Sequence, residues 1–259
     1  MDVAVLGLGE AGGRIAADLV AAGCTVRGWD PARRPTGVAN ADSDLGAVRG
    51  ADVVLSLTTA AVALDAAVRV AGALGGDTLY ADLNTASPQL KRELAETLPV
   101  QFADVALIGV VPSTGLATVT LASGAGAERF AELFRPLGMP VEVVGPRPGD
   151  AAGLKLLRSV FMKGIAAAAI EAVEAARAAG AEDRVRADIA AVVGEPLLDR
   201  LLSGSRTHAA RRVDEMRAAA AYLEELGVAP RVASAAAAWL EQLRDTGSHE
   251  TARTSPASG

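Results

Sequence analysis

A glycine-rich turn near the N-terminus is the feature that most constrains the fold of this chain. A short apolar run, Val3–Leu6, leads directly into Gly7-Leu8-Gly9-Glu10-Ala11-Gly12, and a helix-like segment follows to about Ala22. In this G-x-G-x-x-G pattern the first glycine permits a tight turn, the second lets another molecule approach the backbone, and the third lets helix pack on strand. The pattern predicts a strand, a turn and a helix at the start of a parallel α/β sheet.

Strand-like and helix-like segments continue to alternate through residue 148. The later strands are expected at Thr25–Trp29, Val53–Leu57, Thr78–Ala81, Val100–Ala106, Ala117–Ala122 and Pro140–Val144. The helices between them are expected near Ala60–Ala73, Pro88–Leu98 (with Ser87 as N-cap) and Ala127–Phe134. This alternation is typical of βαβ units, so residues 1–148 are predicted to form a doubly wound Rossmann domain with a mainly parallel sheet.

The composition changes near Gly145–Gly149, where prolines and glycines interrupt regular structure. The first 148 residues contain 18 glycines and residues 149–246 contain seven. The second region is predicted to be all helical, with helices at Asp150–Ala179, Glu182–Val193, Pro196–Leu202, Arg206–Leu226 and Pro230–Arg244. Its many alanines favour close helix packing, and we expect a homodimer formed through this domain. Residues 247–259 are rich in Ser, Thr, Gly and Pro and are expected to be a disordered tail.

Composition and charge exclude several classes of protein. The net charge of −6 and an aromatic content of only 3% argue against nucleic-acid binding. The single cysteine, Cys24, excludes an intramolecular disulfide and a cysteine-rich metal site. The two histidines have no acidic cluster nearby in the sequence, so no metal site is expected. Since the chain has no run of 18 apolar residues and no basic leader, we expect a soluble cytoplasmic protein without a membrane segment.

An acidic residue stands where the glycine-rich turn needs a partner for dinucleotide binding. Phosphates would sit at the N-terminus of the first helix, and Asp30 ends the second strand eighteen residues after Gly12. There its carboxylate can accept a hydrogen bond from a ribose 2′-hydroxyl. Asp30 would repel a 2′-phosphate and so favours NAD, whereas Arg33 and Arg34 would accept that phosphate, as in NADP, if Asp30 turned away.

Small polar residues follow the strands expected at Val53–Leu57 and Thr78–Ala81: Thr58 after the first, and Asn84 and Thr85 after the second. Because ligands bind outside the carboxyl ends of the strands in doubly wound sheets, these residues are expected to face the ribose or nicotinamide of a dinucleotide. The predicted cofactor-binding residues are therefore Gly7, Leu8, Gly9, Glu10, Ala11, Gly12, Asp30, Thr58, Asn84 and Thr85.

Three motifs in order give the chain a specific family resemblance. They are Gly7–Gly12, Asp82-Leu83-Asn84-Thr85-Ala86-Ser87-Pro88, and Gly149-Asp150-Ala151-Ala152-Gly153-Leu154-Lys155. Together they resemble the β-hydroxyacid dehydrogenase superfamily, which includes 6-phosphogluconate and 3-hydroxyisobutyrate dehydrogenases. The helical half resembles a less characterised branch whose 6-phosphogluconate-dehydrogenase-like domain has unknown specificity. The resemblance implies an NAD(P)-dependent oxidoreductase that transfers hydride between nicotinamide and a small hydroxy acid or oxo compound.

By this resemblance Lys155 matches the catalytic lysine of the superfamily. Oxidation of an alcohol needs a group that takes the hydroxyl proton, and lysine can serve because its pKa shifts readily, unlike that of arginine. The choice of lysine is notable, since Lys91, Lys155 and Lys163 are the only lysines among 25 basic residues. Ser159, four residues on, takes the place of an asparagine that helps hold the substrate hydroxyl.

The expected substrate pocket departs from the superfamily pattern. Gly109 survives from the Ser-Gly-Gly that grips a substrate carboxylate, but Ile108 replaces the serine. The fold therefore also suits a reductase of an imine, ketone or specialised acyl compound, or an NAD(P)-binding regulatory protein without catalysis. Lys163 and His208 are candidate substrate contacts. His208 begins a helical face with Arg211, Arg212 and Glu215, which either binds an anion or is an exposed face of ion pairs.

Overall fold

The computed structural model describes residues 1–207 and 209–253, except for the side chains of residues 204–207, 209–211 and 244–253. The chain divides into two compact units, Met1–Lys155 and Leu156 onward. The division falls seven residues after the expected boundary at 148/149. The reason is local: the first turn of the long helix that begins at Asp150 is hydrogen-bonded to strands of the first unit.

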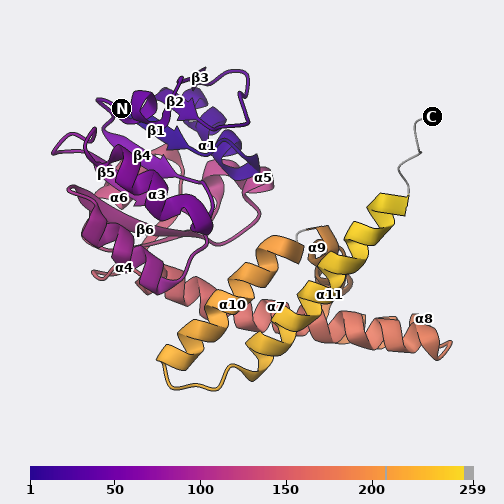
Figure 1. Cartoon of the computed structure of the whole chain (residues 1–259). Helices are drawn as coiled ribbons and strands as arrows, with labels where there is room; N and C mark the ends of the chain where they lie inside the picture. Colours follow the sequence, from indigo (N-terminus) through magenta and orange to yellow (C-terminus); the bar gives the residue numbers. More distant parts are fainter. Residues whose placement is uncertain (208, 254–259) are drawn as a thin grey trace. The chain divides into compact units, whose positions relative to one another are not determined.

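The first unit is built on one eight-stranded sheet with the order β3-β2-β1-β4-β5-β6-β7-β8 (Figure 1). All neighbouring strands are parallel except β6 and β7, which confirms the predicted α/β class and mainly parallel sheet. The strands are β1 (Asp2–Leu6), β2 (Thr25–Trp29), β3 (Ala39–Asn40), β4 (Val53–Ser56), β5 (Leu79–Asp82), β6 (Gln101–Leu107), β7 (Thr120–Ser123) and β8 (Val141–Gly145). Chain order reverses beside β1, and the crevice at such a point is where doubly wound sheets bind ligands.

Both faces of the sheet are buried, as a parallel sheet requires. Along β1, Val3 and Val5 point into one apolar cluster, and Ala4 and Leu6 point into the other. The main helices that supply the first cluster are α1 (Glu10–Ala21) and α6 (Ala127–Phe134), with Val111 and Leu116 added from the segment between β6 and β7. Those that supply the second are α2 (Asp44–Val48), α3 (Ala60–Ala71) and α4 (Pro88–Thr97). The alternation along β1 therefore fixes which helices lie on which face.

The short elements were not anticipated. These are β3, α2, a single turn at α5 (Val111–Thr114), and the 3₁₀ turns η1 (Gly115–Ala117) and η2 (Arg135–Leu137). The strand expected at Ala117–Ala122 begins only at Thr120, so that prediction was wrong at its start. Gly115 adopts a φ of +54° and Thr118 donates its hydroxyl to the Gly115 carbonyl, which closes a turn in place of the first strand residues.

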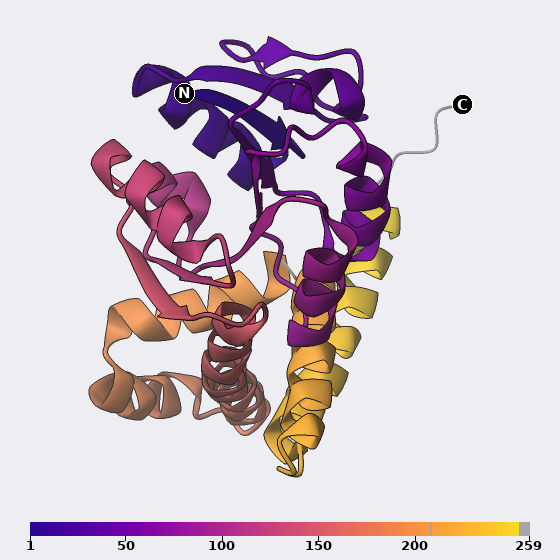
Figure 2. The same ribbon diagram turned by 90° about the vertical axis from the view of Figure 1, so that its left-hand side faces the viewer.

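The second unit is helical. Helix α7 (Asp150–Ala178) begins in the first unit and continues into the second, and it is followed by α8 (Glu182–Val193), α9 (Glu195–Thr207), α10 (Ala209–Glu225) and α11 (Arg231–Arg253). Helices α10 and α11 run side by side (Figure 2). Val213 and Met216 of α10 pack in one cluster with Ala236 and Leu240 of α11. The alanines at this contact let the two helices approach closely, as the composition predicted.

The ends of three helices differ from expectation. Helix α9 continues to Thr207 instead of ending at Leu202, and α10 begins at Ala209 instead of Arg206. Helix α11 continues to Arg253 instead of Arg244, so it includes residues 247–253, which were expected in a disordered tail. No proline lies between residues 231 and 253, and Ser, Thr and a single Gly lower helix propensity without ending a helix. Residues 254–259 lie outside the described residues.

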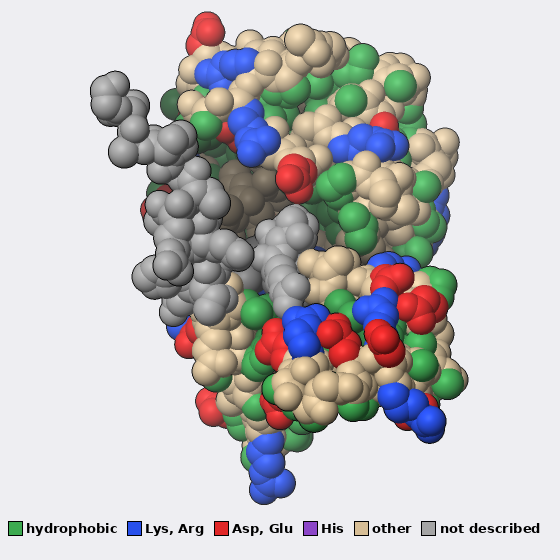
Figure 3. Space-filling view, turned by 90° about the vertical axis from the view of Figure 1, so that its right-hand side faces the viewer, with side chains coloured by type: hydrophobic (Ala, Val, Ile, Leu, Met, Phe, Trp, Pro, Cys, Tyr) green, Lys and Arg blue, Asp and Glu red, His purple; other side chains and the backbone are tan. Residues whose placement is uncertain are grey.

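Charged side chains on the described surface are mixed in sign. Arg177 pairs with Glu182, Arg184 with Asp188, and Arg186 with both Glu195 and Asp199. Figure 3 shows this mixing of acidic and basic side chains on one face of the molecule. Within the described part of the chain, no helix is both long and apolar enough to cross a membrane.

Candidate functional site

The glycine-rich turn has the geometry that its sequence predicts. Gly7 has a φ of +92°, and a Cβ there would overlap the Leu57 carbonyl. A Cβ on Gly12 would overlap the Gly7 carbonyl oxygen. At Gly9, the N-cap of α1, a Cβ would meet nothing within 4 Å. The first N–H groups of α1 lack intrahelical acceptors, so this open backbone can receive a phosphate.

Asp30 lies where a ribose acceptor is expected, immediately after β2. Its Oδ2 accepts a hydrogen bond from the Leu8 N–H at 2.9 Å, and its Oδ1 accepts from the N–H groups of Ala32 and Arg33 at 2.8 and 3.0 Å. The carboxylate is therefore fixed beside the glycine-rich turn. The Arg34 guanidinium donates to the Asp30 and Arg33 carbonyls, so it is bonded to the backbone of its own loop.

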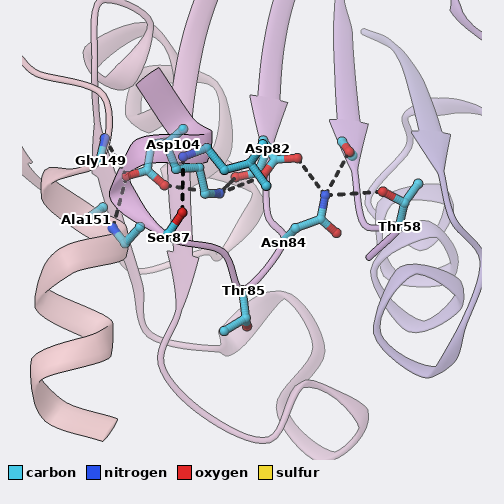
Figure 4. Close-up of polar contacts among 12 residues, drawn as sticks. Thr58, Asp82, Asn84, Thr85, Ser87, Asp104, Gly149 and Ala151 are labelled. Atoms are coloured by element: carbon cyan, nitrogen blue, oxygen red, sulfur yellow. Dashed lines mark hydrogen bonds and ion pairs between the residues drawn. The ribbon is translucent and has the colours of Figure 1, made fainter. Parts of the chain in front are cut away.

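A row of polar groups crosses the carboxyl ends of β4 and β5 (Figure 4). The Asn84 amide lies within hydrogen-bonding distance of three oxygens: Asp82 Oδ2 at 2.6 Å, Ser56 Oγ at 3.1 Å and Thr58 Oγ1 at 3.3 Å. The side chain of Asn84 is buried. The structure thus brings the predicted cofactor-binding residues Thr58 and Asn84 together at the expected edge of the sheet.

Lys91 is part of a buried ion cluster that the sequence analysis did not predict. Its Nζ lies 2.6 Å from Asp82 Oδ1, 2.8 Å from the Asp82 carbonyl oxygen and 3.2 Å from Asp104 Oδ1. All three side chains are completely buried. Burial alone would lower the pKa of Lys91, but the carboxylates of Asp82 and Asp104 outweigh it and raise the pKa above its ordinary value.

One sequence signal could have found this cluster. The buried residues of α4 are Pro88, Lys91 and Leu94, at intervals of three. A lysine on the apolar stripe of a helix needs a buried counter-ion, because an isolated buried charge is too costly. Asp82 at the end of β5 and Asp104 in β6 are the carboxylates that the sheet brings to it.

Asp104 also receives the start of α7. Its Oδ2 accepts hydrogen bonds from the N–H groups of Gly149 and Ala152, at 3.1 and 3.0 Å, and from the Ser123 hydroxyl at 3.0 Å. The Ser123 Oγ in turn accepts from the Ala151 N–H (Figure 4). The carboxylate and the hydroxyl together satisfy N–H groups at a helix end that would otherwise be buried without acceptors.

Lys155 reaches the Asn84–Thr85 loop from the end of the first turn of α7. Its Nζ donates to Thr85 Oγ1 at 2.8 Å, and both side chains are only partly buried. The first unit therefore places two residues selected from separate motifs, 70 positions apart, in direct contact.

Ser159 and Lys163 follow on the same face of α7, at i+4 and i+8 from Lys155. In the second unit the Ser159 hydroxyl bonds Glu215, and Lys163 Nζ lies 2.9 Å from Glu215 Oε1 and 3.2 Å from Ser159 Oγ. Glu215 is buried with an exposed fraction of 7%. The interpretation of its helix face as exposed ion pairs was therefore wrong for Glu215, because α10 turns this carboxylate toward α7.

The remaining predicted contacts are only partly described. Gly109 is exposed just after β6, beside the half-buried Ile108. His208 and the side chain of Arg211 lie outside the described residues, and Arg212 is partly buried. Among the described residues, no group of three or more His, Cys, Asp or Glu side chains is arranged to hold a metal ion.

The fold and the glycine-rich turn define a dinucleotide-binding protein of the Rossmann class. Residues 2–139 match the NAD binding domain of 6-phosphogluconate dehydrogenase, and residues 176–243 match a domain of unknown function, DUF1932. The chain belongs to this 6-phosphogluconate-dehydrogenase family of NAD-binding domains, within the β-hydroxyacid dehydrogenase superfamily. The expected resemblance is thereby confirmed, and a nicotinamide cofactor is supported.

Individual relatives agree with this assignment. The chain is 30% identical over 173 residues to an uncharacterised 28.5 kDa protein of Methanothermus fervidus, covering 65% of this chain and 66% of that protein. It is 30% identical over 143 residues to 3-hydroxyisobutyrate dehydrogenase of Pseudomonas aeruginosa, covering 50% and 48%. The matches thus span under two thirds of each relative. A conserved hypothetical protein from Sinorhizobium meliloti has a similar structure, with a TM-score of 0.73, 31% identity and coverage of 93% and 87%.

Proposed function

We propose that the protein is an NAD-dependent oxidoreductase of the β-hydroxyacid dehydrogenase type that acts on a small hydroxy acid or the corresponding oxo compound. The observation that carries this proposal is the contact between Lys155 Nζ and Thr85 Oγ1 at 2.8 Å. It fixes a titratable amine beside the loop that follows β5, at the edge of the sheet where the family binds its nicotinamide cofactor. When bound, that cofactor accepts or supplies the hydride.

Lys155 serves as the proton donor and acceptor. Oxidation of the substrate alcohol releases the hydroxyl proton, and a positioned base accelerates that transfer. The amine of Lys155 can take this proton, whereas the guanidinium of an arginine in its place could not. Arg158 lies on the exposed side of α7. Thr85 keeps the amine in place through its hydroxyl. Ser159, held by Glu215 and Lys163, is proposed to lie near the substrate hydroxyl.

Asp30 supports NAD as the nucleotide. Three backbone N–H groups hold its carboxylate beside the glycine-rich turn. Held there, the carboxylate offers an acceptor to a ribose 2′-hydroxyl and repels a 2′-phosphate. Arg34, which would otherwise neutralise such a phosphate, already donates to two carbonyl oxygens of the loop.

The test is Lys155→Ala, with Arg158→Ala as the matched control on the same helix. We expect Lys155→Ala to lose turnover of 3-hydroxyisobutyrate or 3-hydroxypropionate with NAD by about 10²–10⁴-fold, the usual contribution of a general base. NADH affinity, measured by fluorescence titration, should stay within about twofold in both variants, and Arg158→Ala should keep its turnover. Unchanged turnover in Lys155→Ala would reject the mechanism.

A neutral imine, ketone or specialised acyl compound is the second candidate substrate class. Ile108 is half-buried where the superfamily has a carboxylate-binding serine, and Lys163 is ion-paired to Glu215. Reduction of a cyclic imine or a simple ketone with NADH, without activity on 3-hydroxy acids, would favour this class. A strict requirement for a carboxylate would reject it. Stoichiometric NADH binding without turnover of any of these compounds would instead favour a regulatory role.

A further inference from the structure

The buried ions Lys91, Asp82 and Asp104 connect the two segments that meet at Lys155. Neither Lys91 nor Asp104 is exposed, so neither can bind a ligand directly. Two carboxylates nevertheless share one ammonium in the interior, which is an expensive arrangement to bury. What distinguishes the cluster is the set of backbone segments that its hydrogen bonds hold.

On one side, the cluster fixes the loop that carries Thr85. Lys91 Nζ binds both the carboxylate and the carbonyl oxygen of Asp82, the last residue of β5. The other carboxylate oxygen of Asp82 accepts from Asn84 Nδ2 at 2.6 Å. Asp82 is thus held at two atoms by Lys91, and it holds Asn84, the residue immediately before Thr85.

On the other side, the cluster fixes the start of the helix that carries Lys155. Asp104 Oδ1 faces Lys91, and its Oδ2 accepts the N–H groups of Gly149 and Ala152. Ala152 lies three residues before Lys155, less than one helical turn. Gly149 has a φ of +99°, and a Cβ there would lie 2.9 Å from Cβ and the carbonyl oxygen of Pro88 at the start of α4. The start of α7 therefore lies directly against the start of the helix that carries Lys91.

We propose that Lys91 and Asp104 are positioning residues for Lys155, which they hold against Thr85 without contacting any ligand. The proposal rests on the catalytic role proposed for Lys155. Its physical basis is that a displacement of about 1 Å in a reacting group is enough to slow catalysis. Lys91 makes two hydrogen bonds to Asp82 and an ion pair with Asp104. These charged contacts resist such a displacement because each weakens when its atoms move apart.

The variant Asp104→Asn tests this coupling while it keeps the size of the side chain. It leaves Lys91 paired with Asp82, one charge against one. If the new amide keeps its oxygen toward the N–H groups of Gly149 and Ala152, its NH₂ group faces the Lys91 ammonium and the contact with Lys91 is lost. If it turns the other way, the hydrogen bonds to the start of α7 are lost instead. Ser123→Ala is a milder variant that removes a hydroxyl bonded to Asp104 and to the Ala151 N–H. Lys91→Met completes the series if thermal unfolding shows that it folds.

The measured quantity is the acetylation rate of each lysine by acetic anhydride, quantified by peptide mass spectrometry between pH 7 and 10. With only three lysines, each is read separately, and Lys163 in the second unit serves as an internal reference. We expect Asp104→Asn and Ser123→Ala to raise the rate at Lys155 by about three- to tenfold, the value of one hydrogen bond. Thr85→Val removes the hydroxyl that Lys155 contacts directly, so its increase in the acetylation rate at Lys155 is the largest expected in the series.

Thr78→Val is the matched control. Thr78 donates a buried hydroxyl hydrogen bond to the Ala51 carbonyl at 2.9 Å, so its loss is a comparable structural defect just before β5. The proposal requires the Lys155 rate to stay unchanged in Thr78→Val and the Lys163 rate to stay unchanged in all variants. The proposal would be overturned if the acetylation rate at Lys155 rose equally in Thr78→Val and Ser123→Ala. It would also be overturned if that rate did not change in a folded Asp104→Asn variant. Because no substrate is used, this outcome is independent of whether Lys155→Ala loses turnover.

Discussion

Tyr80 and Lys91 are two buried groups that both interact with the charge of Asp82, and the pKa of each is shifted upward. Burial and the charge of Asp82 raise the pKa of Tyr80, while the two carboxylates raise that of Lys91 against the effect of burial. In both cases the folded protein holds its proton more tightly than the unfolded chain does. Their contribution to stability is therefore complete below the unfolded pKa values, near 10, and is lost as the pH rises above them.

We accordingly expect the urea midpoint of unfolding to fall steeply above about pH 10, the unfolded pKa of tyrosine. In Tyr80→Phe the slope of unfolding free energy against pH should be shallower by up to about 1.4 kcal/mol per pH unit, the effect of one proton. Tyr222→Phe, which removes the only other phenol of the chain, is the control. Identical slopes in the wild type and Tyr80→Phe between pH 10 and 12 would contradict the assignment.

The three lysines show how far the contacts of a single residue can be predicted from the sequence. In a chain with 25 basic residues, each lysine has a specific partner: Lys91 with two aspartates, Lys155 with Thr85, and Lys163 with Glu215. The motif context of Lys155 predicts a catalytic role for it, and that role stays a prediction. The position of Lys91 on a buried helix stripe indicates that it needs a counter-ion, but the sequence does not say which side chains pair with Lys91 or Lys163. Those partners lie 9 to 52 positions away, and only the fold brings them close.

At the scale of elements, two glycines of the turn from β1 to α1 have different roles: Gly12 is needed for the fold, and Gly9 is predicted to be needed only for nucleotide binding. Gly12 has no room for a Cβ, since it would overlap the Gly7 carbonyl, whereas Gly9 has a φ of −64° and open space around it. Gly9→Ala should therefore fold with nearly wild-type stability and lose NADH affinity, because the methyl group occupies the approach of the pyrophosphate.

Gly12→Ala should lose both folding stability and NADH affinity, because the new methyl group overlaps the Gly7 carbonyl oxygen and pushes α1 away from β1. Thermal unfolding and NADH fluorescence titration on the two variants make the comparison. If Gly9→Ala binds NADH as well as the wild type, the phosphates do not approach this turn.

The long elements could be predicted from sequence and the short ones could not. The helices at Ala127–Phe134 and Glu182–Val193 and the strand at Thr25–Trp29 have the predicted bounds, since apolar spacing and flanking glycines define them. The two-residue β3 and the single turn α5 have no periodicity to detect. The predicted end of α11 is wrong because Gly, Ser and Thr only lower helix propensity, and none of them removes a backbone donor as proline does.

For the whole molecule, the choice of nucleotide should appear as a difference in stabilisation. A ligand that binds only the folded state raises its stability in proportion to the logarithm of concentration over Kd. We expect NAD to raise the melting temperature more than NADP at equal concentration. Asp30→Asn keeps an oxygen acceptor but removes the charge, so it should narrow or reverse this difference. Asp42→Asn, an exposed carboxylate in the same unit, is the control. A larger shift with NADP in the wild type would reject the NAD preference.

The helical unit should also determine the oligomeric state. A groove between α7 and α11 is lined mainly by small residues, including Gly164, Ala168, Ala172, Ala235 and Ala238. Small side chains let the helices of a second copy approach closely, and Val232 beside them is 53% exposed. We therefore expect a homodimer in sedimentation velocity, with this groove in the contact.

Ala168→Arg and Ala235→Arg place a charge in the groove and should shift the protein to monomer while the first unit still binds NADH. Ala187→Arg, on the exposed side of α8, should leave the dimer intact. A wild-type monomer at micromolar concentration, or dimers that persist in both groove variants, would show that this face does not hold two copies together.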